Sequence, residues 1–201
     1  MYSILDIYLD YFNGADRPVR RLEQLLRWAE TPVSFVVDRH NHAFARWKRR
    51  FRLGSIPAPS HILHVDEHHD MMDERMQTNI ANLMYHAMRV WPECRVHWVV
   101  VDPIDSPAMW LSEETWSSFR TRFTLGPERP RGWPRPNLVS VCTSPAFVES
   151  NLREDLLGVV QRFKTRRPRK GNAEQSHDDG PQAAQVRQAS CRRFCGMFGR
   201  G

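Results

Sequence analysis

Short apolar runs that favour β-strands alternate along this chain with segments of helical periodicity. The strand-like runs are residues 5–12, 33–37, 61–66, 95–102 and 138–143. The helical segments between and after them are residues 19–30, 40–51, 79–90 and 147–163. The run "RVHWVVVD" is almost continuously apolar, as expected for a strand that is buried on both faces. This alternation predicts an α/β fold with three layers (αβα), in which helices cover both faces of a mostly parallel sheet.

Two segments depart from this pattern. Residues 103–137 form a long insertion rich in Pro, Ser, Trp and Arg, with one helical candidate near 112–122. Long irregular insertions in compact domains often bind substrates. From residue 165 the apolar pattern stops, and the composition cannot bury enough surface to fold. We therefore expect a catalytic domain over 1–164 and a disordered basic tail over 165–201.

The net charge of +6 at first suggests a nucleic-acid partner. Residues 165–201 hold 8 of the 29 Lys and Arg residues and 3 of the 23 Asp and Glu residues, which leaves 21 and 20 for the rest of the chain. The predicted domain is therefore nearly neutral, and no zinc-finger spacing or RNA-binding signature accompanies the basic tail. No apolar run reaches the roughly 18 to 20 residues of a membrane span, and no secretory signal pattern opens the chain. We expect a cytoplasmic protein with neither a nucleic-acid nor a membrane partner, whose four cysteines stay reduced.

The strongest chemical signal is "HVDEHHDMM" at residues 64–72. At the end of a strand, a spacing of two would project Asp66, His68 and Asp70 to one side, and Glu67 and His69 to the other. Two carboxylates and one imidazole suit divalent ions such as Mn²⁺, Fe²⁺ or Zn²⁺. Ligands of open α/β sheets bind beyond the carboxyl ends of strands, which is where this motif falls. The alternative is a polar strand-to-loop junction that happens to be rich in Asp and His.

Two further strands carry polar residues that fit the same centre. "VVDRHNHAF" at 36–44 places histidines just past a strand, and we favour His40 over His42 as a ligand. The opening run "LDIYLDYF" would place Asp6, Tyr8 and Asp10 on one face of an extended strand. A lone histidine at a strand end is usually structural, but beside the 66–70 motif it becomes a candidate ligand.

Together these motifs resemble the binuclear manganese site of the ureohydrolases, the family of arginase and agmatinase. The closer resemblance is to the peptide arginases of ribosomal-peptide maturation, which are short ureohydrolase-like proteins. The matching pieces occur here in the same order: "LDIYLDYF", "VVDRHNHAF", "LHVDEHHDMM", "NIANL" and "VSVCTSPAF". The resemblance covers about residues 1–163 and implies an arginase-like fold. The strand order is rearranged relative to arginase, because the D-x-D strand comes first here.

The resemblance implies a reaction in which hydroxide, activated by two Mn²⁺ ions, attacks the guanidinium carbon of an arginine in a precursor peptide. Urea leaves, and ornithine remains in the peptide. Asp70, Asp66 and His40 would hold one ion, and His68, Asp66, Asp6 and Asp10 the other. Asp70 and His86 are the catalytic candidates, although His86 can equally be a structural, partly buried histidine. The candidates for substrate binding are Asn82, Thr143 and Ser144, whereas Cys142 is expected to be a buried structural thiol.

Tyr8 departs from the family pattern, which has a ligand aspartate at this position. Tyrosine is a poor ligand for Mn²⁺ at neutral pH because its pKa lies near 10. Three outcomes stay open: Asp10 substitutes, the second ion is held weakly, or the protein binds peptide without catalysis. Another reading keeps the scaffold but changes the substrate to a small guanidino or amide compound.

Overall fold

A six-stranded, all-parallel sheet forms the centre of the structure. The computed structural model describes residues 1–103 and 105–164, so the predicted tail over 165–201 lies outside the described residues. The strands are β1 (Ser3–Tyr8), β2 (Val33–Val37), β3 (His61–Val65), β4 (Arg95–Val99), β5 (Phe123–Gly126) and β6 (Leu138–Cys142). The α-helices are α1 (Pro18–Ala29), α2 (His40–Arg52), α3 (Leu83–Val90), α4 (Glu113–Phe119) and α5 (Ser150–Lys164). Two 3-10 turns, η1 (Leu9–Phe12) and η2 (Pro107–Met109), complete the described elements.

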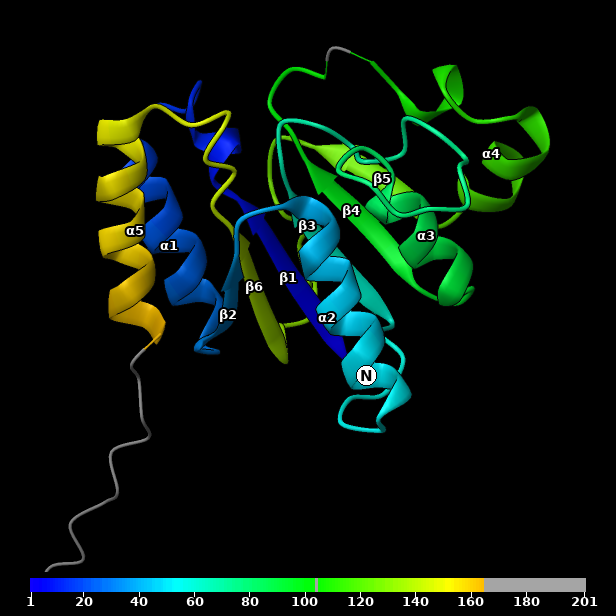
Figure 1. Ribbon diagram of the computed structural model, residues 1–201, viewed down its shortest axis with the longest axis horizontal. Coiled ribbons are helices and arrows are strands. Elements are labelled where there is room, and N and C mark those ends of the chain that lie inside the picture. The colour runs from blue at the N-terminus through cyan, green and yellow to red at the C-terminus, as the bar shows by residue number, and fades with distance from the viewer. Residues whose placement is uncertain (104, 165–201) are drawn as a thin grey trace, which may run out of the picture. The chain divides into compact units, whose positions relative to one another are not determined.

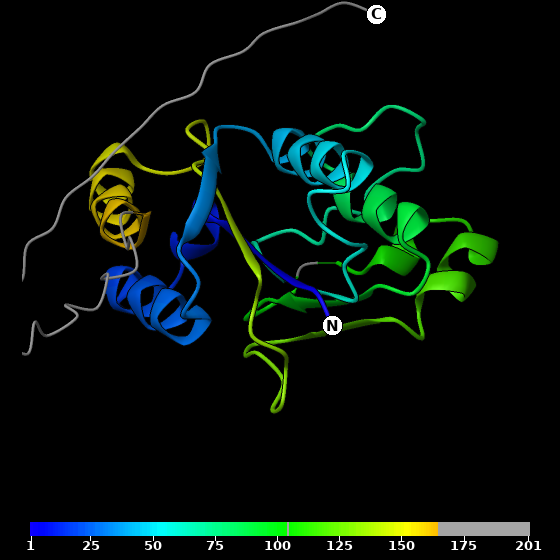
Figure 2. The same ribbon diagram turned by 90° about the horizontal axis from the view of Figure 1, so that it is seen from below.

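The strand order in the sheet is β2-β6-β1-β3-β4-β5, and every neighbouring pair is parallel. Helices α1 and α5 pack together on one face, and α2 and α3 cover the other (Figure 1 and Figure 2). The predicted α/β architecture with three layers is thereby confirmed. No helix of the described part is long and apolar enough to cross a bilayer.

The alternation of side chains along each strand divides the core into two clusters. On β1, Ile4 and Tyr8 pack in the cluster beneath α2 and α3, whereas Leu5 and Ile7 pack in the cluster beneath α1 and α5. Helix α1 is amphipathic and buries Leu22, Leu26 and Ala29 at helical spacing. Both faces of the central strands are therefore apolar, and polar side chains within them stand out.

The chain order creates a switch point beside β1. From β1 the chain runs through α1 to β2 on one side of the sheet, and then returns through α2 to β3 on the other side. In open α/β sheets such a reversal leaves a crevice beyond the carboxyl ends of the strands, and ligands bind there. The loops after β1, β2, β3 and β6 all lead toward this edge.

The structure corrects three details of the predicted elements. The opening strand ends at Tyr8, and residues 9–12 form a 3-10 turn rather than a continued strand. The helix predicted over 79–90 begins only at Leu83, and Ile80, predicted on its apolar stripe, is 45% exposed. The insertion over 103–137 contains a strand, β5, in addition to the expected helix.

Candidate metal centre

Five side chains with metal-ligating chemistry converge at the carboxyl edge of the sheet. Asp10 comes from η1 after β1, and His40 is the first residue of α2 after β2. The loop after β3 supplies the three others, Asp66, His68 and Asp70. The sequence motifs predicted all five, from three separate stretches of chain. Two of these loops follow neighbouring strands, since β1 pairs directly with β3.

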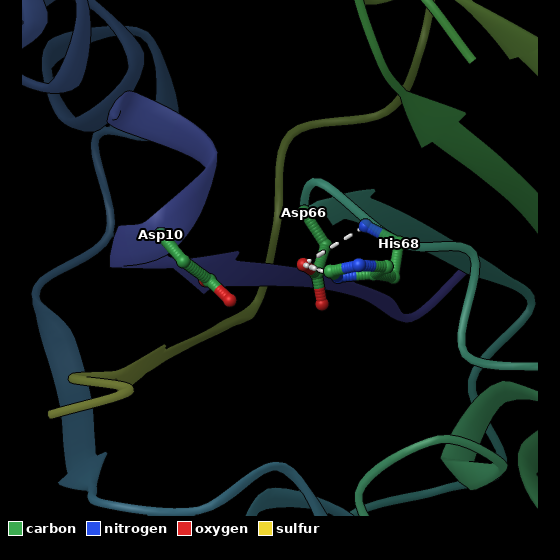
Figure 3. A group of neighbouring side chains, drawn as sticks. All are labelled: Asp10, Asp66 and His68. Carbon is green, nitrogen blue, oxygen red and sulfur yellow. Dashed lines mark hydrogen bonds and ion pairs between the residues drawn. The ribbon is translucent and has the colours of Figure 1, made fainter. Parts of the chain in front are cut away.

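These side chains form two groups that share one carboxylate. The first is His40, Asp66 and Asp70, all buried, and the second is Asp10, Asp66 and His68. Within each group the candidate ligand atoms lie within 4.8 Å of one another. Figure 3 shows the second group, with the carboxylate of Asp10 directed toward Asp66. A carboxylate common to two groups can bridge two cations, because each of its oxygens can bind one.

The loop after β3 holds its ligands by winding back on itself rather than by strand alternation. The backbone N–H of His68 donates to Asp66 Oδ1 at 3.2 Å. Asp70 has a positive φ of 53°, a left-handed conformation that reverses the chain. Its carbonyl accepts the N–H of Met84 in the first turn of α3 at 3.0 Å. The sequence therefore predicted the right three residues for a different reason, because the extended geometry on which the spacing of two depends ends at Val65.

Neighbours outside the ligand set hold this loop in place. His69 is fully buried; its Nδ1 accepts the N–H of Met71 at 3.0 Å, and its Nε2 lies 3.1 Å from Asp105 Oδ1. The indole N–H of Trp98 donates to the carbonyl of Asp66 at 2.9 Å. Glu67, in contrast, is exposed. Glu67 and His69 were both predicted to point away from the ligands. The structure exposes Glu67 to solvent and buries His69, which has a structural role.

His40 lies between three carboxylates. Its Nδ1 is 3.0 Å from Asp70 Oδ2 and 3.5 Å from Asp66 Oδ2, and its Nε2 is 3.9 Å from Asp10 Oδ2. The hydroxyl of Ser144 lies 3.2 Å from Nε2. Ser144 is buried with a positive φ of 42°, so the turn after β6 places its hydroxyl against the imidazole. Of the two histidines in this segment, His42 points away, since it is exposed and pairs with Asp38.

His64 is a central residue of the site that the sequence motifs did not single out. It is fully buried, with Nδ1 at 3.2 Å from Asp6 Oδ2 and Nε2 at 3.1 Å from the carbonyl of His68. Its Nε2 also lies 3.6 Å from Asp66 Oδ2. Because a carbonyl only accepts hydrogen bonds, Nε2 carries a hydrogen. The signal was present, because residues two apart on β3 share a face and His64 precedes Asp66 by two.

Asp6 lies behind the ligands rather than among them. Its Oδ2 faces His64, and its Oδ1 accepts the hydroxyl of Ser140 at 2.9 Å. Neither ligand group contains Asp6. Both of its oxygens are therefore engaged with protein partners, so Asp6, which the resemblance implied as a ligand, lies outside both groups, and Asp66 is the carboxylate that belongs to both.

Burial of so many acids in one place raises their affinity for protons. Loss of hydration raises the pKa of Asp66 well above its usual range, and the nearby charges of Asp70 and Asp10 raise it further. Burial likewise raises the pKa of Asp10 and Asp6. Burial alone would lower the pKa of His40, but the charge of Asp70 and the hydrogen bond to it dominate and raise it. The cluster therefore carries an excess of negative charge that a cation would compensate.

The donor set fits divalent cations. Asp10 Oδ1 and Asp66 Oδ2 are buried without a hydrogen-bond partner, and such orphaned acceptors are costly unless a proton or a metal ion meets them. Carboxylate oxygens with imidazole nitrogens suit Mn²⁺, Fe²⁺ and Zn²⁺. These residues can therefore hold a metal ion, whose identity the ligand types alone leave open.

A cavity of about 180 Å³ opens onto the two ligand groups. Asp10, His40, His68 and Asp70 form its polar part. Its remaining walls are apolar and consist of Met72, Ile80, Ala81 and Phe147. Ile80 and Phe147 are 45% and 56% exposed, so they stand at the mouth of the cavity. The site thus combines a charged floor with apolar walls.

Three of the remaining candidates lie away from this cavity's lining. Asn82 is fully buried, and its side chain shapes the loop before α3. Its Nδ2 donates to Asp73 and to the carbonyl of Gln77, and its Oδ1 accepts the N–H of Asn79. His86 stacks near Phe44 and Tyr85, and burial lowers its pKa. Thr143 continues the sheet by donating its N–H to the carbonyl of Val37 at 2.9 Å. Cys142 is a buried free thiol whose pKa burial raises to about 12.

Tyr8 packs directly against the site. It is fully buried, with its ring centroid 4.0 Å from that of His40 and 5.3 Å from that of His64. Its hydroxyl has no hydrogen-bond partner, and burial followed by the charge of Asp6 raises its pKa well above 10. The phenol is therefore a neutral neighbour of the ligand histidine.

Comparisons with protein-family models, with curated proteins and with solved structures found no match for this chain. We therefore infer its function from the side chains at the site, together with the motifs that they belong to.

Proposed function

We propose that this protein is a metal-dependent hydrolase of the arginase-like type, which converts arginine side chains of a ribosomally made precursor peptide to ornithine and urea. The observation that carries this proposal is the pair of ligand groups that share the buried Asp66 and whose other members, Asp10, His40, His68 and Asp70, line the cavity. Two adjacent cation sites with a common carboxylate are typical of hydrolases that activate water. The ordered motifs resemble those of the peptide arginases, and this resemblance is the reason for proposing a guanidinium substrate and Mn²⁺ as the metal.

A bound pair of divalent cations would supply hydroxide at neutral pH by lowering the pKa of water. The chain's own residues define where that attack takes place. Asp10 and Asp70 lie at the polar end of the cavity, so the guanidinium of an arginine side chain that enters it would reach the ions that these residues would hold. His40 is held by Ser144 and Asp70, so its orientation is fixed before substrate arrives.

The cavity favours one long side chain over a complete small molecule. Its volume of about 180 Å³ is below the roughly 300–1,000 Å³ of pockets that enclose whole drug-sized ligands. The apolar walls, Met72, Ile80, Ala81 and Phe147, suit the three methylene groups of arginine. Because Ile80 and Phe147 are exposed at the mouth, a peptide backbone can remain outside while its side chain enters.

The proposal is tested by mass spectrometry on peptides with one central arginine and varied neighbours, incubated with protein and Mn²⁺. The expected product has lost the mass of cyanamide, which is urea minus water, and urea appears in equal amount. Asp66→Asn removes the shared ligand charge, so it should lower the rate by at least about 100-fold. Asp38→Asn is the matched control, since Asp38 is exposed and outside both ligand groups.

Peptides in which lysine replaces arginine should stay unchanged. If protein with bound metal modifies none of the arginine peptides, the proposed reaction is wrong. Hydrolysis that proceeds equally well in Asp66→Asn would place the chemistry elsewhere on the molecule.

A second candidate is a peptide-binding protein with an incomplete metal site. Tyr8 favours it, because a neutral, fully buried phenol stands beside His40 where the resembling family carries a ligand aspartate. Elemental analysis separates the two functions: two ions per chain support the hydrolase, and one or none supports the binding protein. Tyr8→Asp should then gain an ion, whereas Tyr8→Phe, which keeps the ring, should not.

A further inference from the structure

A second cavity, larger than the first, opens on the face of the sheet that carries α1. Its volume is about 620 Å³. Its lining comes from η1, α1, the last residues of β3 and β4, and the loop after β5. We call it the basic cleft, after its four arginines and the two aromatic rings beside them: Arg17, Arg20, Arg21, Arg129, Tyr11 and Trp28.

Two arginines of the basic cleft, Arg21 and Arg129, are held in position by aromatic rings and backbone carbonyls. The guanidinium of Arg21 lies over Tyr11 and donates to the carbonyl of Pro127 at 3.2 Å. That of Arg129 lies over Trp28 and donates to the carbonyl of Pro130 at 3.1 Å. Rings and carbonyls orient a guanidinium and leave its positive charge available to a ligand.

The two other arginines, Arg17 and Arg20, make fewer contacts with the rest of the protein. Arg17 is 3.8 Å from Asp16, and both side chains are largely exposed, so this ion pair is weak. Within the described part of the chain, Arg20 makes no ion pair or hydrogen bond. Asp16 and Glu128 are the acids of the lining, so the four arginines leave it positive. A ligand of this cleft should therefore be an anion that brings several separate negative charges.

The detail of the lining favours a polypeptide over a nucleic acid. Tyr11 and Trp28 already carry guanidinium groups, so they cannot also stack bases, which is how single strands are usually held. Asp16 and Glu128 would repel an unbroken run of phosphates. Val65 and Val99 offer apolar contacts at the base of the cleft. From these features we propose that the basic cleft binds an acidic segment of a polypeptide.

The basic cleft and the candidate metal centre are adjacent at one edge of the sheet, because consecutive residues of the chain belong to the two sites. Asp10 lines the cavity of the metal centre, and the next residue, Tyr11, lines the basic cleft. Val65 likewise lines the basic cleft, and the next residue, Asp66, is the shared ligand. If the proposed function holds, the acidic segment belongs to the same peptide as the arginine and passes over this edge.

Binding is tested first without metal and without arginine. The probe is a fluorescein-labelled peptide of alternating Glu and Leu, followed by anisotropy against metal-free protein. Arg17→Glu/Arg20→Glu should weaken binding at least tenfold. Arg17 is the N-cap residue of α1 and Arg20 lies in its first turn, and glutamate at this end of a helix suits the helix dipole, so this variant should fold. Arg49→Glu/Arg52→Glu, which changes two exposed arginines of α2 by the same charge, should bind as the wild type does.

Equal affinity of the wild type and the Arg17→Glu/Arg20→Glu variant would overturn the proposal, as would tighter binding of a labelled oligouridylate than of the acidic peptide. A second measurement uses peptides that carry one arginine with or without an appended acidic segment. The segment should lower KM in the wild type but not in the variant, with unchanged kcat. If no arginine is hydrolysed, the proposed function is wrong, but the anisotropy measurement still tests binding of an acidic segment. If the acidic peptide does not bind, the proposal for the basic cleft is wrong, but the proposed hydrolase activity is unaffected.

Discussion

His64 supports the acidic cluster from inside the sheet. It joins Asp6 on β1 to the carbonyl of His68 in the ligand loop, and its ring is fully buried. Asp6 in turn is supported by Ser140 on β6. This chain of contacts crosses three neighbouring strands, so the ligand loop is anchored to the middle of the sheet.

We expect His64→Leu to destabilise the protein strongly. The substitution leaves the buried Asp6 carboxylate without its imidazole partner and the carbonyl of His68 without a donor. A buried polar group that is left without its hydrogen-bond partner costs about 1–3 kcal/mol, and more if the group is charged. The measurement is the free energy of unfolding in urea, without metal. His42→Leu, at an exposed histidine, should change it by less than about 0.5 kcal/mol. Equal stability of both variants would show that His64 is not needed to compensate Asp6.

At the scale of elements, His97 joins β4 to β5 and to the loop that enters the basic cleft. Its Nδ1 lies 2.8 Å from the hydroxyl of Thr124 on β5, and its Nε2 donates to the carbonyl of Glu128 at 3.0 Å. This pattern suits a neutral ring, because Nδ1 can accept from the hydroxyl while Nε2 donates. Burial accordingly lowers the pKa of His97 below its ordinary 6.5.

This lowered pKa predicts a specific loss of stability in mild acid. Below pH 6.5 the unfolded chain takes up a proton at His97, whereas the folded chain does not until the pH reaches its lower folded pKa. The unfolded state therefore binds more protons in that window, and stability falls as the pH falls. Comparing urea unfolding at pH 7.5 and 5.5 should show a smaller loss for His97→Gln than for the wild type. Identical losses would mean that His97 titrates normally in the fold.

The elements also show how far the sequence could predict the site. Alternation along β1 correctly placed Asp6 and Tyr8 on one face, since the strand is regular there. It gave the wrong backbone for Asp10, because a 3-10 turn that no local signal indicates follows Tyr8. The buried role of Asn82 was missed because its partner Asp73 lies in an irregular loop. Contacts within regular elements follow from periodicity, whereas contacts between loops depend on the folded chain.

For the whole molecule, the acidic cluster makes metal binding compete with protonation. The pKa values of Asp6, Asp10 and Asp66 are raised by burial in the folded, metal-free state. Protons therefore bind these carboxylates at a higher pH than they bind ordinary ones, and a metal ion must displace them.

We expect the affinity for Mn²⁺ to fall as the pH is lowered from 7.5 toward 5.5, well above the pH at which exposed aspartates titrate. Calorimetric titration at both values, in two buffers with different ionisation enthalpies, should show proton release that is larger at the lower pH. Mn²⁺ should also raise the melting temperature, and a chelator should reverse this. An affinity independent of pH across this range would contradict the raised pKa values.

The position of β6 has a consequence for how the chain is made. Of the described strands it is the last along the chain, yet it pairs between β2 and β1, with contacts such as Ser140 to Asp6 that span 134 residues. Until residues 138–142 emerge from the ribosome, the facing edges of β1 and β2 stay unpaired, and the strand ends that carry Asp10 and His40 are not joined through the sheet. Pairings this distant form slowly, and open strand edges invite association with other chains. We therefore expect the candidate metal centre to be completed late in folding, and a nascent chain stalled before β6 to be prone to aggregation.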